Sequence, residues 1–169
     1  CIFEYIYFTR PDSLINKKSA YEYRKNLGLE LAKETDVDAD LIVPVPDSGV
    51  PAALGFAKQT KKEFDLGLIR NHYVGRTFIE PVQNIRSLGV KLKLSPTKTI
   101  VKDKSIILID DSLVRGTTCH KIVKMLYESG AKEVHVRIAC PEIKFPDFYG
   151  VDMPTKEELL AHGKNVVEM

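Results

Sequence analysis

The feature that most constrains the fold of this chain is a short apolar run that ends abruptly in two acids. Residues Ser105–Ile109 have the length and composition of a buried β-strand, and Asp110 and Asp111 follow them directly. A helical pattern then begins at Thr117 and ends at Gly130, because glycine commonly terminates helices. The sequence therefore predicts a buried strand that leads through a polar loop into a helix.

The same alternation of strand and helix extends over most of the chain. Apolar residues with helical spacing follow Ser19, a favourable N-cap, and follow the turn at residues 46–49. This spacing predicts an α/β fold with a parallel central sheet of about five strands flanked by helices. Ligands bind such sheets at the carboxyl ends of the strands. The other strands expected within this alternation are Leu41–Val45, Leu66–Ile69 and Glu133–Ile138. A further strand, Ile2–Phe8, is expected at the N-terminus.

Two regions fall outside this alternation. Residues 71–99 are polar and interrupted by glycine and proline, which is typical of a functional lid or of a disordered loop, with an antiparallel excursion as an alternative for part of them. The N-terminal strand and the tail after Pro141 are predicted to form a small hood over the site. The inward face of the first helix is expected to comprise Ala20, Tyr23, Leu27 and Leu31.

The composition narrows the class of protein. The chain has 169 residues, which favours one domain, and its formal net charge of +2 gives no electrostatic argument for nucleic acid or an anionic membrane. It has no apolar run of membrane-spanning length and no signal peptide, and its three cysteines indicate a reduced, cytoplasmic chain. It begins with Cys1 rather than Met, so we expect a part of a longer protein.

The loop after Asp111 has the composition of an anion-binding turn. Gly116 permits tight backbone curvature, and Thr117 and Thr118 add hydroxyl donors at the positive end of a helix. The two acids instead suit sugar hydroxyls or Mg²⁺, which prefers oxygen ligands. A phosphate loop beside two acids therefore predicts a ribose 5-phosphate site, with an ordinary polar turn as the alternative. A Walker A loop is excluded, because its glycine and lysine pattern does not occur.

Residues 106–118 resemble the motif with which type I phosphoribosyltransferases bind phosphoribosyl pyrophosphate (PRPP). The version Asp-Asp-Ser-x-Val-Arg-Gly-Thr-Thr, which begins at Asp110, is similar in particular to that of the amidophosphoribosyltransferase family. Other stretches resemble the same family in the same order, which makes the likeness more specific than the PRPP motif alone. They are Glu4–Phe8 with Arg10–Ser13, Val45–Ser48, Tyr73–Phe78 and Phe148–Asp152.

The resemblance implies a type I phosphoribosyltransferase fold over residues 1–169 and an enzyme of the pentosyltransferase class. Members of the family displace pyrophosphate from C1 of PRPP with ammonia, which gives 5-phosphoribosylamine, in the first step of de novo purine nucleotide synthesis. A separate N-terminal glutaminase domain, which this sequence does not contain, supplies the ammonia from glutamine. The family also implies inhibition by AMP or GMP and a homo-oligomeric state.

The resemblance assigns roles around the two acids. Mg²⁺ would be held by Ser48, Asp110 and Asp111, and the turn that contains Asp47 and Ser48 would bind the pyrophosphate. The 5-phosphate would lie on the loop that follows the acids. The substrate-binding residues implied are Asp47, Ser48, Lys93, Asp110, Asp111, Ser112, Val114, Arg115, Gly116, Thr117 and Thr118.

A catalytic lid is implied over residues 71–88, with Arg70, Tyr73 and Arg76 as its catalytic residues. Departure of pyrophosphate leaves positive charge on the ribose, so a lid that excludes water would protect the reactive centre. His72 stands where the family has a basic residue, and a neutral histidine would bind pyrophosphate more weakly.

Some members of the family hold a [4Fe–4S] cluster with four cysteines. Cys1 fits one of these positions, but Asp147 occupies a second, and a carboxylate is a hard ligand that suits this cluster poorly. The other two ligands would lie beyond Met169. We therefore expect no iron–sulfur cluster, and we expect Cys119 and Cys140 to be packing residues.

Two other functions remain open from the sequence. A purine-salvage phosphoribosyltransferase shares the PRPP motif and accepts a free base in place of ammonia, but it should not share the stretch Tyr73–Phe78. A non-catalytic module that senses PRPP or nucleotides would be expected to lose the lid or the acid pair. This sequence has both features.

Overall fold

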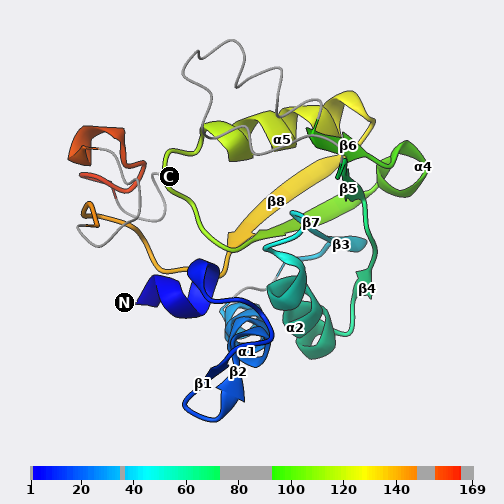
Figure 1. The fold of residues 1–169 in the computed structure, drawn as a ribbon. Helices are drawn as coiled ribbons and strands as arrows, with labels where there is room; N and C mark the ends of the chain where they lie inside the picture. Colours follow the sequence, from blue (N-terminus) through cyan, green and yellow to red (C-terminus); the bar gives the residue numbers. More distant parts are fainter. Residues whose placement is uncertain (1, 35–36, 73–92, 148–154, 165–169) are drawn as a thin grey trace.

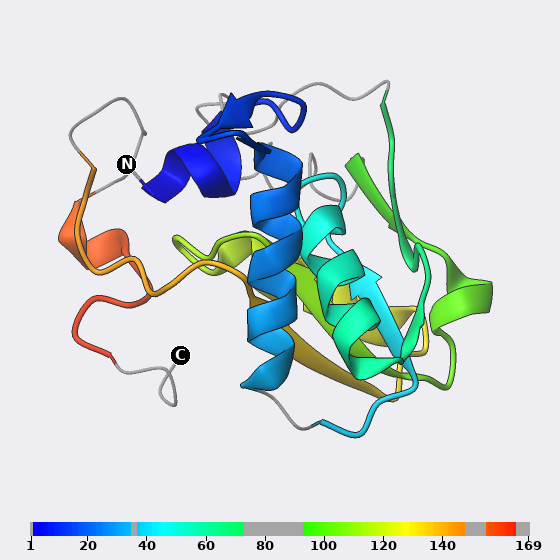
Figure 2. The same ribbon diagram turned by 90° about the horizontal axis from the view of Figure 1, so that it is seen from below.

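In the computed structural model, parallel strands form a central sheet with helices on both faces (Figure 1). The structure describes residues 2–34, 37–72, 93–147 and 155–164. The sheet and its helices comprise α1 Ala20–Lys33, β3 Leu41–Pro44, α2 Val50–Thr60, β4 Glu63–Phe64, β7 Ser105–Asp110, α5 Thr117–Glu128 and β8 Glu133–Ile138. The strand order is β4-β3-β7-β8. Helix α5 covers one face, while α1 and α2 lie side by side on the other (Figure 2).

The predicted parallel α/β sheet is confirmed, but its membership differs from the prediction. The described part of the chain contributes four parallel strands where about five were expected. β5, Leu68–Arg70, pairs in antiparallel fashion with β6, Leu94–Pro96, in a separate two-stranded sheet, and α4, Lys98–Val101, follows. The apolar pattern around β5 predicted a strand correctly, but such a pattern does not identify the partner of a strand. β4 is too short to be recognised by periodicity.

The two faces of β7 pack into two separate cores. Ile106 and Leu108 lie in a cluster with apolar residues of α5, whereas Ile107 and Ile109 pack with residues of α1 and α2. Burying each of these side chains fully contributes about 1.5–3 kcal/mol. Because alternate side chains of a strand point to opposite faces, Asp110 follows Ile106 and Leu108 toward the α5 face.

Helix α1 begins as predicted, but its most buried side is rotated away from the expected one. The Glu22 N–H donates to Ser19 Oγ over 3.2 Å, and the Ser19 N–H donates to Glu22 Oε2 over 3.0 Å, which forms a capping box. The most buried residues are Ala20, Arg24, Gly28 and Ala32. Of the expected inward residues, Ala20 is buried, and Tyr23, Leu27 and Leu31 are half-buried, with Leu27 and Leu31 packed against core clusters. Gly28 explains the rotation, since a Cβ there would lie 1.8 Å from the Ala52 carbonyl oxygen. The two helices therefore touch through backbone.

A hood is present beside the carboxyl ends of the strands, but its N-terminal part is helical and not the predicted strand. Glu4–Phe8 forms a π-helical turn. A strand and a helix cannot be distinguished by periodicity in so short an apolar run. Apolar side chains of this turn and of the tail form a third cluster. The backbone of the two segments lies at the same end of the molecule (Figure 1). Its buried members are Phe3, Ile6, Cys140, Ile143 and Leu159.

Arg24 fastens the N-terminal helix to α1. Its side chain is buried, and its guanidinium donates to the carbonyl oxygens of Tyr5 over 2.9 Å and of Thr9 over 2.7 Å. Tyr5 lies in the single turn Glu4–Phe8 and Thr9 directly follows it, so these carbonyl groups lack helical partners. A charged residue on the inward face of α1 thus replaces the apolar contact that the helical pattern predicted.

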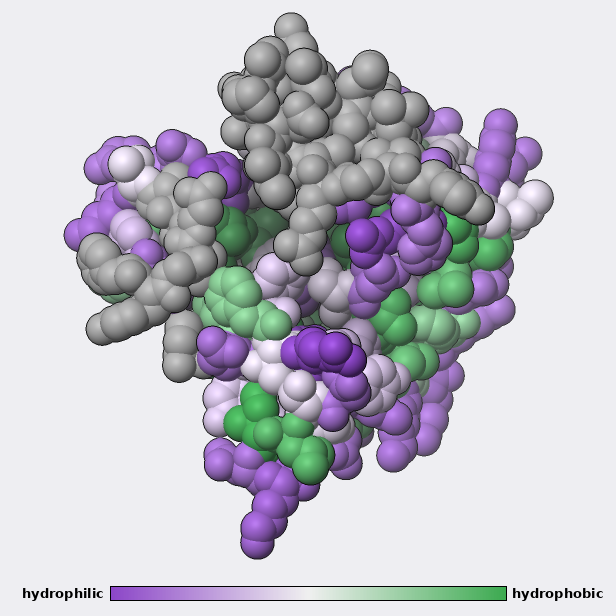
Figure 3. All heavy atoms as spheres, viewed as in Figure 1, coloured by the Kyte–Doolittle hydropathy of each residue, from purple (hydrophilic) through white to green (hydrophobic). Residues whose placement is uncertain are grey.

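The N-terminal elements expose apolar surface (Figure 3). They include the short hairpin of β1, Leu14–Ile15, and β2, Lys18–Ser19. None of the helices in the described ranges is long and apolar enough to cross a membrane. The most exposed large apolar side chains of this region are Ile2, Tyr7, Phe8 and Leu14.

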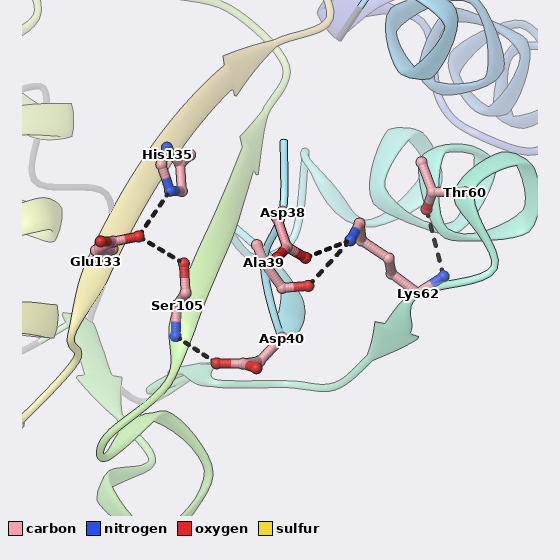
Figure 4. Close-up of polar contacts among 8 residues, drawn as sticks. All are labelled: Asp38, Ala39, Asp40, Thr60, Lys62, Ser105, Glu133 and His135. Atoms are coloured by element: carbon pink, nitrogen blue, oxygen red, sulfur yellow. Dashed lines mark hydrogen bonds and ion pairs between the residues drawn. The ribbon is translucent and has the colours of Figure 1, made fainter. Parts of the chain in front are cut away.

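Polar contacts join the central strands at their amino ends (Figure 4). The Ser105 N–H donates to Asp40 Oδ2 over 2.8 Å, and the Ser105 hydroxyl donates to Glu133 Oε2 over 3.1 Å. Lys62, which precedes β4, donates to the Ala39 carbonyl oxygen over 3.2 Å. All four parallel strands are thereby fixed at the edge opposite to the acids.

Replacement of Gly28 by alanine is expected to destabilise the protein by about 1–3 kcal/mol, because overpacking forces backbone to shift. The new Cβ would meet the backbone of Ala52, so α1 and α2 would have to separate. Urea denaturation should show a lower midpoint for Gly28→Ala, whereas Asn26→Ala at an exposed position of the same helix should not lower it. Equal midpoints for Gly28→Ala and the wild type would contradict the helix contact described above.

Candidate active site

The turn after β3 lies against the end of β7. The Val45 N–H donates to the Ile109 carbonyl oxygen over 2.8 Å, and the Gly49 N–H donates to the Val45 carbonyl oxygen over 2.9 Å. A Cβ at Gly49 would lie 2.4 Å from the same Ile109 oxygen, so a larger residue would push the turn away. The pairing of β3 with β7 therefore brings residues 46–48 next to Asp110.

Asp111 is buried and Asp110 is half-buried at the end of β7. Asp110 accepts a hydrogen bond from the Asp111 N–H over 2.8 Å, and Asp111 accepts one from the Ser112 hydroxyl over 3.0 Å. Burial raises the pKa of both carboxyls, and the neighbouring charge of Asp111 raises the pKa of Asp110 further. A bound cation or hydroxyl donors would stabilise the ionised form of this pair.

The two acids face different surroundings. Burial raises the pKa of the Cys119 and Cys140 thiols to about 11, with a further contribution from Asp110 at Cys119 and from Asp111 at Cys140. Asp110 therefore lies near the first turn of α5, and Asp111 lies near the hood. There the positive charge of Arg24 partly offsets the effect of burial on the pKa of Asp111. Within the described residues, Asp111 Oδ2 is buried without a hydrogen-bond partner. This oxygen is available to a cation or a ligand hydroxyl.

The loop between β7 and α5 presents unused backbone donors. Gly116 has a φ of 76°, a left-handed conformation that favours glycine, and α5 begins at the next residue. In the part of the chain that the structure describes, no backbone carbonyl accepts a hydrogen bond from the N–H groups of residues 113–118. Thr117 is exposed and Thr118 is half-buried. Free N–H groups at a helix N-terminus favour a bound phosphate.

Basic residues reach the same edge of the sheet from β5 and β6. Arg70, the last residue of β5, forms an ion pair with Asp47 in the turn after β3, where the peptide bond between Pro46 and Asp47 is cis. Arg70 Nε is buried and has no hydrogen-bond partner among the described residues. The Asn71 N–H donates to the Lys93 carbonyl oxygen over 2.8 Å, which places Lys93 beside the end of β5.

The donor atoms at this edge suit a hard cation. Ser48, Asp110 and Asp111 offer only oxygen atoms, which is the donor set that Mg²⁺ prefers, and Asp111 Oδ2 is uncommitted. The described residues contain no group of three or more His, Cys, Asp or Glu side chains that could hold a metal ion. Cys119 is half-buried in α5 and Cys140 is buried in the hood cluster, as expected of packing residues.

Not every predicted site residue can be placed. Tyr73 and Arg76 lie outside the described residues, as does Cys1. The Arg115 guanidinium donates to Glu158 Oε2 over 2.8 Å, so this side chain contacts the tail of the chain. Around the acids and the loop, the structure thus gathers Asp47, Ser48, Arg70, Lys93 and residues 110–118 at one edge of the sheet.

Three residues near this edge were not predicted. Arg24 adds positive charge near Asp111, and the spacing of Ala20, Arg24 and Gly28 on one helical face could have identified it. Glu158 and Leu160 contact the loop from the tail. Arg115 and Glu158 are 43 residues apart, and no local pattern connects positions so distant in the sequence.

A parallel α/β sheet with an acid pair and an anion loop at its carboxyl edge is the architecture of a phosphoribosyltransferase domain. The family model described as the phosphoribosyl transferase domain matches residues 17–145, and the chain belongs to this family. Among its relatives are amidophosphoribosyltransferases. That of Rhizobium etli is 58% identical over 162 residues, and that of Methanocaldococcus jannaschii is 55% identical over 169 residues.

These relatives are longer than the chain. The matches cover 96% of the chain and 33% of the Rhizobium etli protein, and 100% of the chain and 36% of the Methanocaldococcus jannaschii protein. A solved structure of glutamine PRPP amidotransferase from B. subtilis, complexed with ADP and GMP, has 52% identity and a TM-score of 0.87. That match covers 99% of the chain and 37% of the solved one. The resemblance and the fold inferred from the sequence are confirmed.

Asp110→Asn is expected to stabilise the ligand-free protein at neutral pH. Burial and the charge of Asp111 raise the pKa of Asp110 above that of the unfolded chain, so ionisation is less favourable in the folded state. Below the unfolded pKa both states are protonated, and stability falls as the pH rises through the folded pKa. The gain from asparagine should therefore be absent below about pH 4 and should grow as the pH rises toward the raised pKa of Asp110.

Thermal unfolding in the presence of a chelator measures this effect across the pH range. Asp103→Asn is the matched control, because Asp103 is an exposed acid and should show no such trend. A lower stability of Asp110→Asn than of wild type at neutral pH would contradict the prediction.

Proposed function

We propose that the intact protein transfers the phosphoribosyl group of PRPP to ammonia, which gives 5-phosphoribosylamine and pyrophosphate, the first step of de novo purine nucleotide synthesis. The observation that carries the proposal is the acid pair at the end of β7, followed at the start of α5 by a loop whose N–H groups bond to no carbonyl of the described ranges. Relatives that are 50% to 58% identical and named amidophosphoribosyltransferase favour ammonia as the acceptor.

The parts of PRPP are assigned to successive parts of the site. The N–H groups of residues 113–118 and the hydroxyls of Thr117 and Thr118 bind the 5-phosphate, since they are donors at a helix N-terminus. Asp110 and Asp111 accept hydrogen bonds from the ribose hydroxyls. The turn at residues 46–49 binds the pyrophosphate. The pairing of β3 with β7 supports this assignment, because it sets the turn and the acids side by side.

Catalysis in this arrangement is electrostatic and positional. The bond from C1 to the pyrophosphate oxygen breaks, nitrogen bonds to C1, and the resulting ammonium group releases a proton. Arg70 and the amides of the turn stabilise the departing anion. Ammonia is a nucleophile without prior deprotonation, so no general base is required and neither His120 nor His135 is assigned a role in proton transfer. Tyr73 and Arg76 are assigned to a lid that excludes water.

Mg²⁺ is the cofactor that this donor set fits. Ser48, Asp110 and Asp111 would hold the ion, and the buried, uncommitted Asp111 Oδ2 supports the assignment. When bound, the ion would neutralise charge on the departing pyrophosphate. Lys93 adds positive charge at the same edge of the sheet.

The proposed partners follow from the family. Residues 1–169 form the phosphoribosyltransferase domain, and a glutaminase domain of the same protein supplies ammonia from glutamine. The related B. subtilis structure is complexed with ADP and GMP, which supports AMP or GMP as inhibitors. In this proposal the protein is cytoplasmic, forms a homo-oligomer, and binds neither nucleic acid nor membranes.

One assay separates this function from its alternatives. Ammonia-dependent consumption of PRPP supports the proposal, whereas consumption that depends on a purine base would identify a salvage enzyme. Binding of PRPP without consumption by either acceptor would identify a sensing module.

Calorimetric titration tests the site directly. PRPP should bind the wild type more tightly with Mg²⁺ than without it, and Asp110→Asn should lower the affinity about ten- to hundredfold, since hydrogen bonds to charged groups contribute about 1.5–3 kcal/mol. Asp103→Asn should bind as the wild type does. Unchanged affinity in Asp110→Asn would remove the acid pair from its proposed role.

A further inference from the structure

The tail of the chain contacts the phosphate loop at three consecutive residues. The Leu160 N–H donates to the Val114 carbonyl oxygen over 2.8 Å. Arg115 Nε donates to Glu158 Oε2 over 2.8 Å. The Leu160 side chain lies over Gly116, since its Cδ2 would be 3.1 Å from a Cβ at that position. Figure 1 shows the tail at the end of the molecule where α5 begins.

These contacts come from a segment that is itself well anchored. Leu159 and Ala161, on either side of Leu160, are 3% and 2% exposed. Leu159 belongs to the hood cluster, against which Val114 of the loop also packs. The tail therefore connects the phosphate loop to the hood instead of merely covering the loop.

The hydrogen bond from Leu160 determines the direction of a loop amide. A trans peptide unit is planar, so its carbonyl and its N–H point in opposite directions. The Val114 carbonyl points to the tail, so the Arg115 N–H must point away from it and is not used by the tail. Gly116 continues this turn in its left-handed conformation, beneath the Leu160 side chain.

We propose that Leu160 and Glu158 are positioning residues that preorganise the phosphate loop for the 5-phosphate of PRPP. They act through Val114, Arg115 and Gly116 and touch neither the substrate nor the reacting atoms. The inference rests on the proposed function, because it concerns the binding of the same 5-phosphate. A loop whose N–H groups already face the anion avoids the ordering cost that a mobile loop would incur on binding.

The two residues should contribute unequally. Arg115 and Glu158 keep 37% and 54% of their side-chain surface exposed, and exposed ion pairs stabilise little. The Leu160 side chain packs directly over Gly116, and alanine would remove this contact while it keeps the backbone hydrogen bond to Val114. Shortening the Leu160 side chain is therefore expected to have the larger effect on the loop.

The site offers a test that separates positioning from general folding. Ribose 5-phosphate uses the phosphate loop, whereas Mg²⁺–pyrophosphate uses the turn at residues 46–49 and the acids. In calorimetric titrations of the intact protein, Leu160→Ala should weaken PRPP and ribose 5-phosphate by about tenfold and Glu158→Gln by about threefold. Neither variant should change the affinity for Mg²⁺–pyrophosphate.

Matched variants complete the design. Leu160→Met conserves volume and should restore the affinity that Leu160→Ala loses. Glu157→Gln is the control for charge, because Glu157 is exposed and neighbours Glu158. Bound ribose 5-phosphate should also slow hydrogen exchange at the Leu160 amide of the wild type, since coupling between sites is reciprocal.

Several results would overturn the inference. Wild-type affinity for ribose 5-phosphate in both Leu160→Ala and Glu158→Gln would show that the tail does not position the loop. An equal loss for ribose 5-phosphate and Mg²⁺–pyrophosphate would show a general defect of the fold. If the wild type itself bound Mg²⁺–pyrophosphate but neither PRPP nor ribose 5-phosphate, the proposed function would fail and this inference with it.

Discussion

The site depends on the parallel pairing of β3 with β7. The Val45 N–H donates to the Ile109 carbonyl oxygen beyond the last paired residues. Gly49 approaches the same oxygen so closely that a residue with a side chain would clash with it. One turn and one loop that are far apart in the sequence thereby share an edge. Polar contacts also join the strands at their amino ends, and this fixes the register of the strands along the sheet.

This edge carries groups that a protein designed only for stability would avoid. The half-buried Asp110 lies next to the buried Asp111, and Asp111 Oδ2 has no partner among the described residues. The N–H groups of residues 113–118 bond to no described carbonyl. An unsatisfied buried polar group costs about 1–3 kcal/mol. Fully buried apolar side chains of β7 offset this cost directly behind the acids. A ligand with a phosphate and hydroxyls would satisfy the groups that the chain leaves open.

Much of this arrangement was predictable because it is local in the sequence. Strand β7, the acid pair, the glycine before α5 and the N-cap at Ser19 each depend on neighbouring residues, and each was identified correctly. The predicted N-terminal strand was wrong because a short apolar run satisfies a helical turn as well as a strand. The inward face of α1 was only partly correct, because Gly28 allows a backbone contact that apolar periodicity does not represent.

The remaining features depend on residues that meet only in the folded chain. Arg24 adds positive charge near Asp111 while its hydrogen bonds hold the end of the N-terminal helix. The loop between β7 and α5 likewise contacts the tail, through Val114 with Leu160 and Arg115 with Glu158. The acids, Gly116 and the two threonines of this loop follow one another in the sequence, so a local pattern could predict them. The tail residues that contact the loop are more than 40 positions away, and no local pattern indicates which distant segment will pack against it.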